Sequence, residues 1–326
     1  MTSRAFGTLP RFTRRAVCAT GLLAIAMSSQ AADFPTRPVE LIVPWAVGGG
    51  SDAVARAFAD VAGRNLPQPV IVVNRPGASG SIGHTEGANA KPDGYKLTLV
   101  TPEVSLAYLQ GIGKTQWQDF NYVARINADP IALVVKADAP WSTLEQFLAH
   151  VRNQPGKTTV SNSGVGATYH LAAVALEKKA NLEFNNVPYI GAGPAVVGLL
   201  GGQVDATFAT TGEVGVHVQG GKLKMLAVMS DKRLKDFAQV PTFKERNIDL
   251  QLGTWRALAV PKATPPDVMA TLRKVVDKAV QDPAYREFFT RQFLGLVNED
   301  GDKFRAVLER ENAFYVDIVG KLQLGK

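Results

Sequence analysis

The feature that most constrains the fold is a repeated pattern in which a short apolar run ends at glycines and a helical segment follows. Its first occurrence comprises a strand at 40–44, a glycine turn at 48–50, a helix at 53–66, strands at 70–73 and 96–100, and a helix at 81–90 between those strands. Strands that alternate with helices in this way predict an α/β fold with a parallel sheet and right-handed crossovers.

The pattern returns in the middle of the chain, between two longer apolar strands at 131–135 and 255–260. The repeating segments are a strand at 158–160, a loop at 161–168, a helix at 169–180, and strands at 186–189, 206–208 and 223–228. The two longer strands read as crossings between lobes. We therefore predict a first lobe of residues 32–132 plus 255–326 and a second lobe of residues 133–254. Two connecting segments form a hinge, with a cleft between the lobes.

The first 31 residues have the layout of an export signal. Four arginines, but no acidic residue, accompany an apolar stretch at 16–27, and small residues at Ser29 and Ala31 suit a cleavage site. Cys18, the only cysteine, lies in this segment, so the exported chain has no disulfide. We expect cleavage near Ala31 and a soluble periplasmic protein; general secretion and twin-arginine export both remain open.

Glycine-rich loops at the ends of two strands suggest where a ligand binds. Gly48, Gly49 and Gly50 precede one helix, and the loop from Ser163 to Thr168 precedes another. Free amides and the positive end of a helix dipole favour an anion, and ligands of open α/β sheets lie at the carboxyl ends of strands. We expect these loops to face each other across the cleft.

Other chemistries are poorly supported. Gly48, Gly50 and Ala53 match a dinucleotide fingerprint, but Asn74 and Arg75 stand where an acidic residue is needed. The four histidines lack the spacing of metal ligands, and no nucleophile elbow is present. Without the signal's four arginines the formal charge of +7 falls to +3, which is weak evidence for nucleic-acid binding. We expect no enzyme activity, no cofactor, no metal and no nucleic-acid partner.

Several motifs resemble the substrate-binding proteins of tripartite tricarboxylate transporters, also called Bug receptors. They occur in family order and include Phe34-Pro35-x-Arg37-Pro38, Asn74-Arg75-Pro76-Gly77-Ala78, Pro92-Asp93-Gly94-Tyr95, Val187-Pro188-Tyr189 and Leu199-Leu200-Gly201-Gly202-Gln203-Val204-Asp205. The resemblance covers nearly the whole exported chain. It implies a two-lobed periplasmic-binding-protein fold, a type II-like Venus flytrap, that serves a membrane permease.

The resemblance also implies a set of ligand-binding positions. Together with the loop argument it gives Trp45, Val47, Gly48, Gly49, Asp52 and Thr101 in the first lobe and Ser163, Gly166 and Thr168 in the second. The chain departs from the family pattern at Ile190, Ala209 and Arg256. If Ala209 faces the cleft, a ligand ammonium group loses a partner, which favours a simple carboxylate. At Arg256 we expect a solvent-facing side chain rather than a ligand contact.

These observations lead to one preferred function and two alternatives. The preferred function is a monomeric receptor that captures a mono- or dicarboxylate and delivers it to the permease subunits of a tripartite tricarboxylate transporter. A sensor that presents its liganded form to a membrane signalling partner would need the same fold. An exported enzyme with an unrecognised site is the third possibility.

Overall fold

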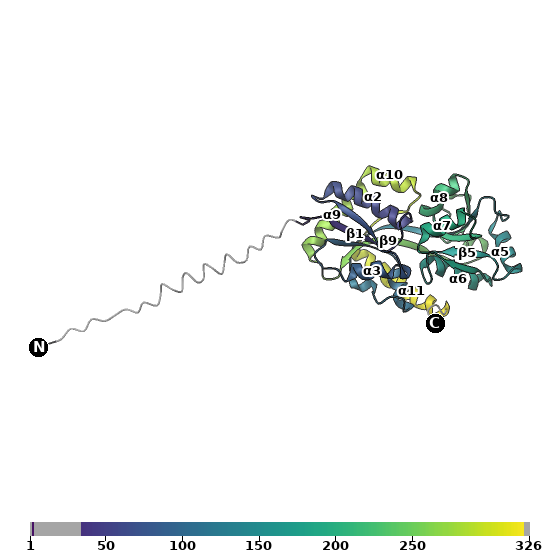
Figure 1. Cartoon of the computed structure of the whole chain (residues 1–326), viewed down its shortest axis with the longest axis horizontal. Coiled ribbons are helices and arrows are strands. Elements are labelled where there is room, and N and C mark those ends of the chain that lie inside the picture. The colour runs from purple at the N-terminus through teal and green to yellow at the C-terminus, as the bar shows by residue number, and fades with distance from the viewer. Residues whose placement is uncertain (1, 3–33, 323–326) are drawn as a thin grey trace.

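The computed structural model describes residue 2 and residues 34–322. The predicted export signal and Cys18 therefore fall outside the described residues, apart from residue 2. The chain forms two α/β lobes that lie side by side (Figure 1). Among the helices of the described part, none is long and apolar enough to cross a membrane.

The first lobe is built on a sheet in which β1 lies between β2 and β3 and pairs with both in parallel. Its strands are β1 (Val39–Val43), β2 (Val70–Asn74), β3 (Lys96–Val100) and β10 (Leu296–Asp300). Its helices are α2 (Gly50–Asn65), α3 (Ser81–Ala88), α4 (Glu103–Leu109), α9 (Pro266–Gln281), α10 (Pro283–Arg291) and α11 (Gly301–Leu322). The apolar faces of α2, α9 and α10 pack on this sheet and form the core of the lobe.

The second lobe repeats this arrangement with β5 paired in parallel with β6 and β7. Its strands are β5 (Thr159–Asn162), β6 (Asn185–Pro188), β7 (Ala206–Thr210) and β8 (Leu223–Val228). Its helices are α5 (Leu144–Asn153), α6 (Thr168–Ala180), α7 (Ala192–Leu200) and α8 (Thr211–Gln219). The bounds of β8 match the predicted strand.

Two antiparallel strands, β4 (Phe120–Lys136) and β9 (Gly253–Pro261), connect the lobes. β4 pairs with β9 as far as Pro130 and then continues into the second lobe, where it pairs with β7 and β8. The predicted crossing strand at 131–135 is thus the second half of a longer strand. The prediction of a two-lobed fold with two crossover strands is confirmed; the lobe boundaries at 132/133 and 254/255 stay a prediction.

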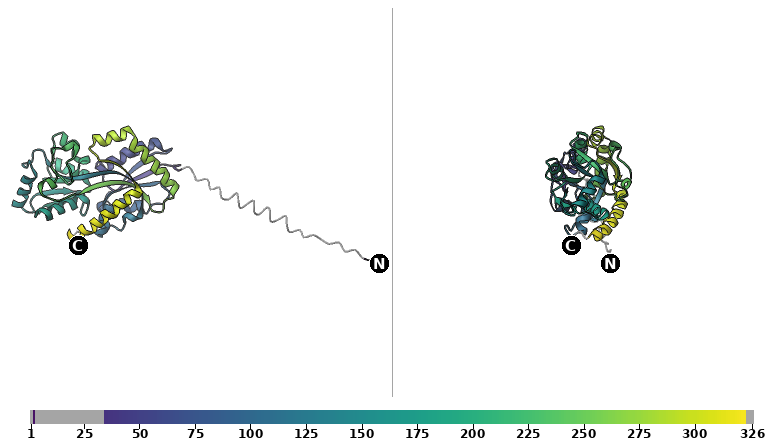
Figure 2. Two further views of the ribbon diagram at one scale, coloured as in Figure 1. Left: turned by 180° about the vertical axis from the view of Figure 1, so that it is seen from behind. Right: turned by 90° about the vertical axis from the view of Figure 1, so that its right-hand side faces the viewer.

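The last helix, α11, contacts both lobes. Figure 2 shows this helix, in yellow, running from the first lobe toward the second. Tyr315 and Val319 of α11 form a small buried cluster with Leu106 of α4 and Leu171 of α6. Because Leu171 belongs to the second lobe, this cluster joins the two lobes.

Candidate functional site

The carboxyl ends of the parallel strands meet at a small cavity of about 30 Å³ between the lobes. Its lining residues from the first lobe are Trp45, Ala46, Gly49, Gly50, Ser51, Thr101 and Glu103. Those from the second lobe are Ser163, Tyr169, Ala192 and Glu213, and β9 contributes Thr254 and Arg256. Four predicted positions, Trp45, Gly49, Thr101 and Ser163, therefore come together here.

The other predicted positions lie beside this cavity rather than on it. Val47 is 64% exposed and does not line the cavity. The amide of Gly48 donates to the Asp52 carboxylate at 3.0 Å. Although burial alone raises the pKa of Asp52, hydrogen bonds from Arg56, Gly48 and Asn74 lower it below its ordinary value. Asp52 thus stabilises the conformation of the first glycine loop through a hydrogen bond from its backbone, and is not itself exposed to the cavity.

Backbone amides of the second glycine loop also donate hydrogen bonds to acceptors within the chain itself. The amide of Gly166 donates to Nδ1 of His170 at 3.0 Å, and burial lowers the pKa of this histidine. The amide and hydroxyl of Thr168 both donate to Oε1 of Glu103, at 3.0 and 2.5 Å. A carboxylate from the first lobe therefore already occupies the N-terminus of α6.

Free amides remain at two other helix N-termini that approach each other across the cleft. In α2 the amides of Gly50 and Ser51 lie in the first turn, where no intrahelical acceptor exists. In α7 the same holds for Ala192 and Gly193. None of these four amides has a hydrogen-bond acceptor within the part of the chain that the structure describes. The α7 terminus was not predicted; the glycine at its start, Gly191, was the available signal.

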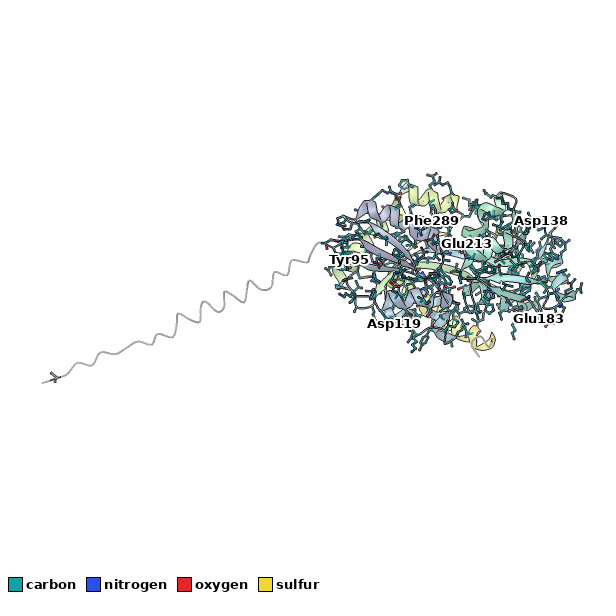
Figure 3. The ribbon with its side chains drawn as sticks, viewed as in Figure 1. Tyr95, Asp119, Asp138, Glu183, Glu213 and Phe289 are labelled. Atoms are coloured by element: carbon teal, nitrogen blue, oxygen red, sulfur yellow. The ribbon has the colours of Figure 1, made fainter. Side chains whose placement is uncertain are left out.

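Arg256 is the central charged group of the site, and the expectation that it faces solvent is wrong. The residue is only 2% exposed. Its Nε donates to Ser51 Oγ at 3.1 Å, its Nη1 to Asn127 Oδ1 at 2.5 Å and to Asp129 Oδ2 at 3.1 Å, and its Nη2 to Glu213 Oε1 at 3.3 Å. Figure 3 labels Glu213 in the region between the lobes.

The environment of Arg256 keeps its positive charge. Burial alone would lower the pKa of Arg256, but Glu213, Tyr169 and Asp129 outweigh burial and raise it. Burial also raises the pKa of Asp129, against the opposing effect of Arg256. Removing one partner from such a buried group leaves an uncompensated charge, so we expect the loss of any one member to destabilise the hinge strands and the cleft wall.

Direct contacts across the cleft hold the lobes together in this structure. Besides the bonds between Glu103 and Thr168, Ser79 Oγ donates to the carbonyl of Val165 at 2.5 Å, and Gln110 Nε2 donates to the carbonyl of Gly166 at 2.8 Å. An outer cavity of about 380 Å³ lies at the mouth of the cleft and shares Trp45 and Ser163 with the inner one. The candidate site therefore has a small polar inner part and a larger outer part.

A buried histidine supports the loop that carries Thr101, and its protonation gives a testable pH dependence. Nε2 of His84 accepts a hydrogen bond from the Thr101 amide at 3.3 Å, and burial lowers its pKa from 6.5 to about 3. The unfolded chain therefore takes up this proton at a higher pH than the folded chain. The contribution to stability is complete above pH 6.5 and is lost as the pH falls toward 3.

We expect His84 to account for a loss of roughly 2 kcal/mol in the free energy of unfolding between pH 7 and pH 5. Urea unfolding of the wild type and of His84→Gln at both values measures this contribution. The variant is expected to lose less stability over the interval, whatever its stability at pH 7. Equal losses for the two proteins would contradict the assignment.

Two α/β lobes joined by two strands, with a polar cavity at the strand ends between them, define the class of two-lobed solute-binding proteins. No cluster of three or more histidine, cysteine, aspartate or glutamate residues suited to a metal occurs among residues 34–322. Residues 54–324 match the model of the tripartite tricarboxylate transporter family receptor, and the chain belongs to this family. The resemblance to Bug receptors is thereby confirmed.

Known relatives extend over the same region. Protein BugT of Bordetella pertussis is 31% identical over 300 residues, 90% of this chain and 92% of that protein. A TctC solute-binding protein from Polaromonas, solved with no ligand, is 46% identical, covers 88% of this chain and 99% of its own, and has a TM-score of 0.66. MatC from Rhodopseudomonas palustris with bound malate is 26% identical, covers 88% and 100%, and has a TM-score of 0.82.

Proposed function

We propose that the protein is a periplasmic receptor that captures a small organic carboxylate between its lobes and delivers it to the membrane subunits of a tripartite tricarboxylate transporter. The observation that carries this proposal is the meeting of the free α2 and α7 amides across the cleft. Backbone amides at helix N-termini donate hydrogen bonds to a carboxylate, and the helix dipole favours its charge, so the site does not need a buried cationic side chain for each carboxylate oxygen. The bound malate of MatC supports a carboxylate as the ligand.

Ligand entry in this proposal needs a hinge motion. A cavity of about 30 Å³ holds a small polar group and leaves no space for a whole organic acid. The lobes must therefore separate, which breaks the bonds that Ser79 and Gln110 donate to the second lobe and the bond that Glu103 accepts from it. The unliganded Polaromonas relative has more sequence in common with this chain than MatC but a lower TM-score, which is consistent with such a motion. The hinge lies where β4 leaves β9, near Pro130 and Gly253.

A ligand that binds only the folded protein raises its melting temperature, which provides the test. We expect at least one acid from a panel of mono- and dicarboxylates, malate included, to stabilise the protein by about 2.7 kcal/mol at a concentration of 100 Kd. Differential scanning fluorimetry identifies the acid and isothermal titration calorimetry gives its Kd. A panel in which no carboxylate or amino acid shifts the melting temperature would overturn the proposed function.

A further inference from the structure

Two glutamates from opposite lobes, Glu103 and Glu213, line the inner cavity beside the free amides. From their contacts we infer that the ligand is a zwitterion, an α-amino acid with an apolar side chain, rather than a plain mono- or dicarboxylate. This inference rests on the proposed function and specifies the substrate class of the same site.

One carboxylate oxygen of Glu103 accepts hydrogen bonds from the chain, and the other accepts none within the described residues. The residue is 4% exposed, and its Oε1 accepts the two bonds from Thr168 described above. For Oε2 no donor exists within the described chain, although Glu103 lines the cavity. Because this oxygen is not among the buried atoms that lack a partner and Glu103 lines the cavity, it is open to a donor from the ligand.

Glu213 is arranged in the same way from the other lobe. Its Oε2 accepts from Tyr169 Oη at 2.7 Å, from the Thr210 amide at 2.9 Å and from Thr210 Oγ1 at 3.1 Å. Among residues 34–322 its Oε1 accepts only from Arg256, at 3.3 Å, which is longer than the usual 2.7–3.2 Å of such bonds. This oxygen can accept a further, shorter hydrogen bond on the cavity side.

The charges around the cavity favour a ligand with a positive group. Its walls contain one cation, Arg256, and two carboxylates, Glu103 and Glu213. Arg256 also pairs with Asp129 behind the wall, at 3.1 Å. A dicarboxylate would add two negative charges to a region that already has more acidic than basic groups. An ammonium group placed between Glu103 and Glu213 instead offsets the excess.

The two ends of an amino acid have separate partners in this cavity. The ligand carboxylate binds the free amides of α2 and α7, and the ammonium group binds the two glutamates. Ala209 gives no argument against an ammonium group, because its side chain is buried in an apolar cluster with Ala132 and Val134 and does not line the cavity.

The body of the ligand has space only toward the mouth of the cleft. The inner cavity has a volume of about 30 Å³, whereas the outer cavity has about 380 Å³ and begins at Trp45. Ile112, Val165 and Ile190 line this outer part, and each is an exposed apolar side chain. Covering such side chains favours an apolar ligand side chain.

Matched ligands test the inference on the wild-type protein. Leucine and phenylalanine are each compared with the same acid lacking the amine, 4-methylpentanoate and 3-phenylpropanoate, and with malate, by isothermal titration calorimetry. We expect one of the amino acids to bind at least about tenfold more tightly than its amine-free analogue. Binding of malate or of an amine-free acid as tight as that of the amino acids would overturn the inference and leave the proposed function intact. Failure of all five compounds would overturn the inference, and failure of the whole carboxylate and amino-acid panel would overturn the proposed function as well.

A charge-neutral variant tests the role of Glu103. Glu103→Gln keeps a carbonyl oxygen for the two Thr168 bonds and removes the charge. We expect it to weaken amino-acid binding at least about tenfold and to leave the amine-free acid bound as tightly as before or more tightly. Glu177→Gln, on the last turns of α6, is the matched control, with amino-acid affinity expected within about twofold of wild type. Equal losses for both kinds of ligand in Glu103→Gln would overturn the ammonium contact.

Discussion

Replacement of Arg256 by methionine is expected to lower the free energy of unfolding by about 3–5 kcal/mol. Methionine fills much of the space of the side chain but leaves Asp129 and Glu213 without their cation. Both acids are almost fully buried, with 2% and 4% of their side chains exposed. The Asn127 and Ser51 side chains also lose a donor. Breaking a buried pair from one side is costly because the remaining charges stay desolvated.

The position of Arg256 in the fold makes this loss affect both lobes. Asn127 and Asp129 lie on β4, Ser51 on α2 and Glu213 on α8, so one guanidinium joins the crossing strands to a helix from each lobe. We expect the loss to be visible in both the helical signal and the tryptophan signal during unfolding.

Equilibrium urea unfolding followed by circular dichroism and fluorescence measures the effect, with Arg233→Met as the control. Arg233 pairs with Glu245 on the surface, where 41% and 44% of the two side chains are exposed. We expect this control to lose at most about 1 kcal/mol. A loss of the same small size in Arg256→Met would mean that the buried network contributes little to stability.

The order of strands and helices could be predicted because each element shows a local pattern. The apolar runs that became β1, β3 and β8 are bounded by glycine, proline or charged residues, and the apolar spacing of α2 is helical. The two crossing strands were found for the same reason. The local pattern does not fix how far a strand continues, so β4 was predicted with less than half its length.

The partners of the loop amides could not be predicted, because they come from distant parts of the chain. Glu103 and Thr168 are 65 positions apart and belong to different lobes. The short helix α4, which carries Glu103, was missed because seven residues give too little periodicity to identify a helix.

The burial of Arg256 did leave a signal in the sequence, because the residues after it in β9 form a continuous apolar run without polar alternation. In the structure every residue from Thr254 to Pro261 is buried, so the strand is covered on both faces. An arginine inside such a continuous apolar run has no solvent-facing side available and must find acidic partners. The sequence alone could not say which acids these are.

Replacement of Gly193 by alanine is expected to weaken ligand binding at least about tenfold without lowering the stability of the protein. Gly193 lies in the first turn of α7, where the second lobe comes closest to the first glycine loop. A Cβ atom there would lie 3.0 Å from the backbone C and O of Gly48 and 3.0 Å from the backbone N of Gly49. These are backbone atoms held by the Asp52 contact, so they cannot rotate away as a side chain would.

The same substitution has the opposite effect on the isolated helix. Alanine has a higher helix propensity than glycine, by about 1 kcal/mol, so the substitution stabilises α7 itself. The conflict arises only when the lobes close, because only then does the added methyl group meet the first loop. Affinity and stability are therefore expected to change in opposite directions, which separates a closure defect from misfolding.

Titration calorimetry with the tightest ligand of the panel and a thermal melt of the unliganded protein test this expectation together. Gly63→Ala is the control, since it is the same change within α2 and its Cβ would lie 3.9 Å from the nearest atoms, Cα of Pro69 and N of Val70. We expect it to raise stability and to keep the affinity within about twofold of wild type. Wild-type affinity in Gly193→Ala would show that the bound lobes stay farther apart than in this structure. In that case the amides of α2 and α7 would not bind the ligand together.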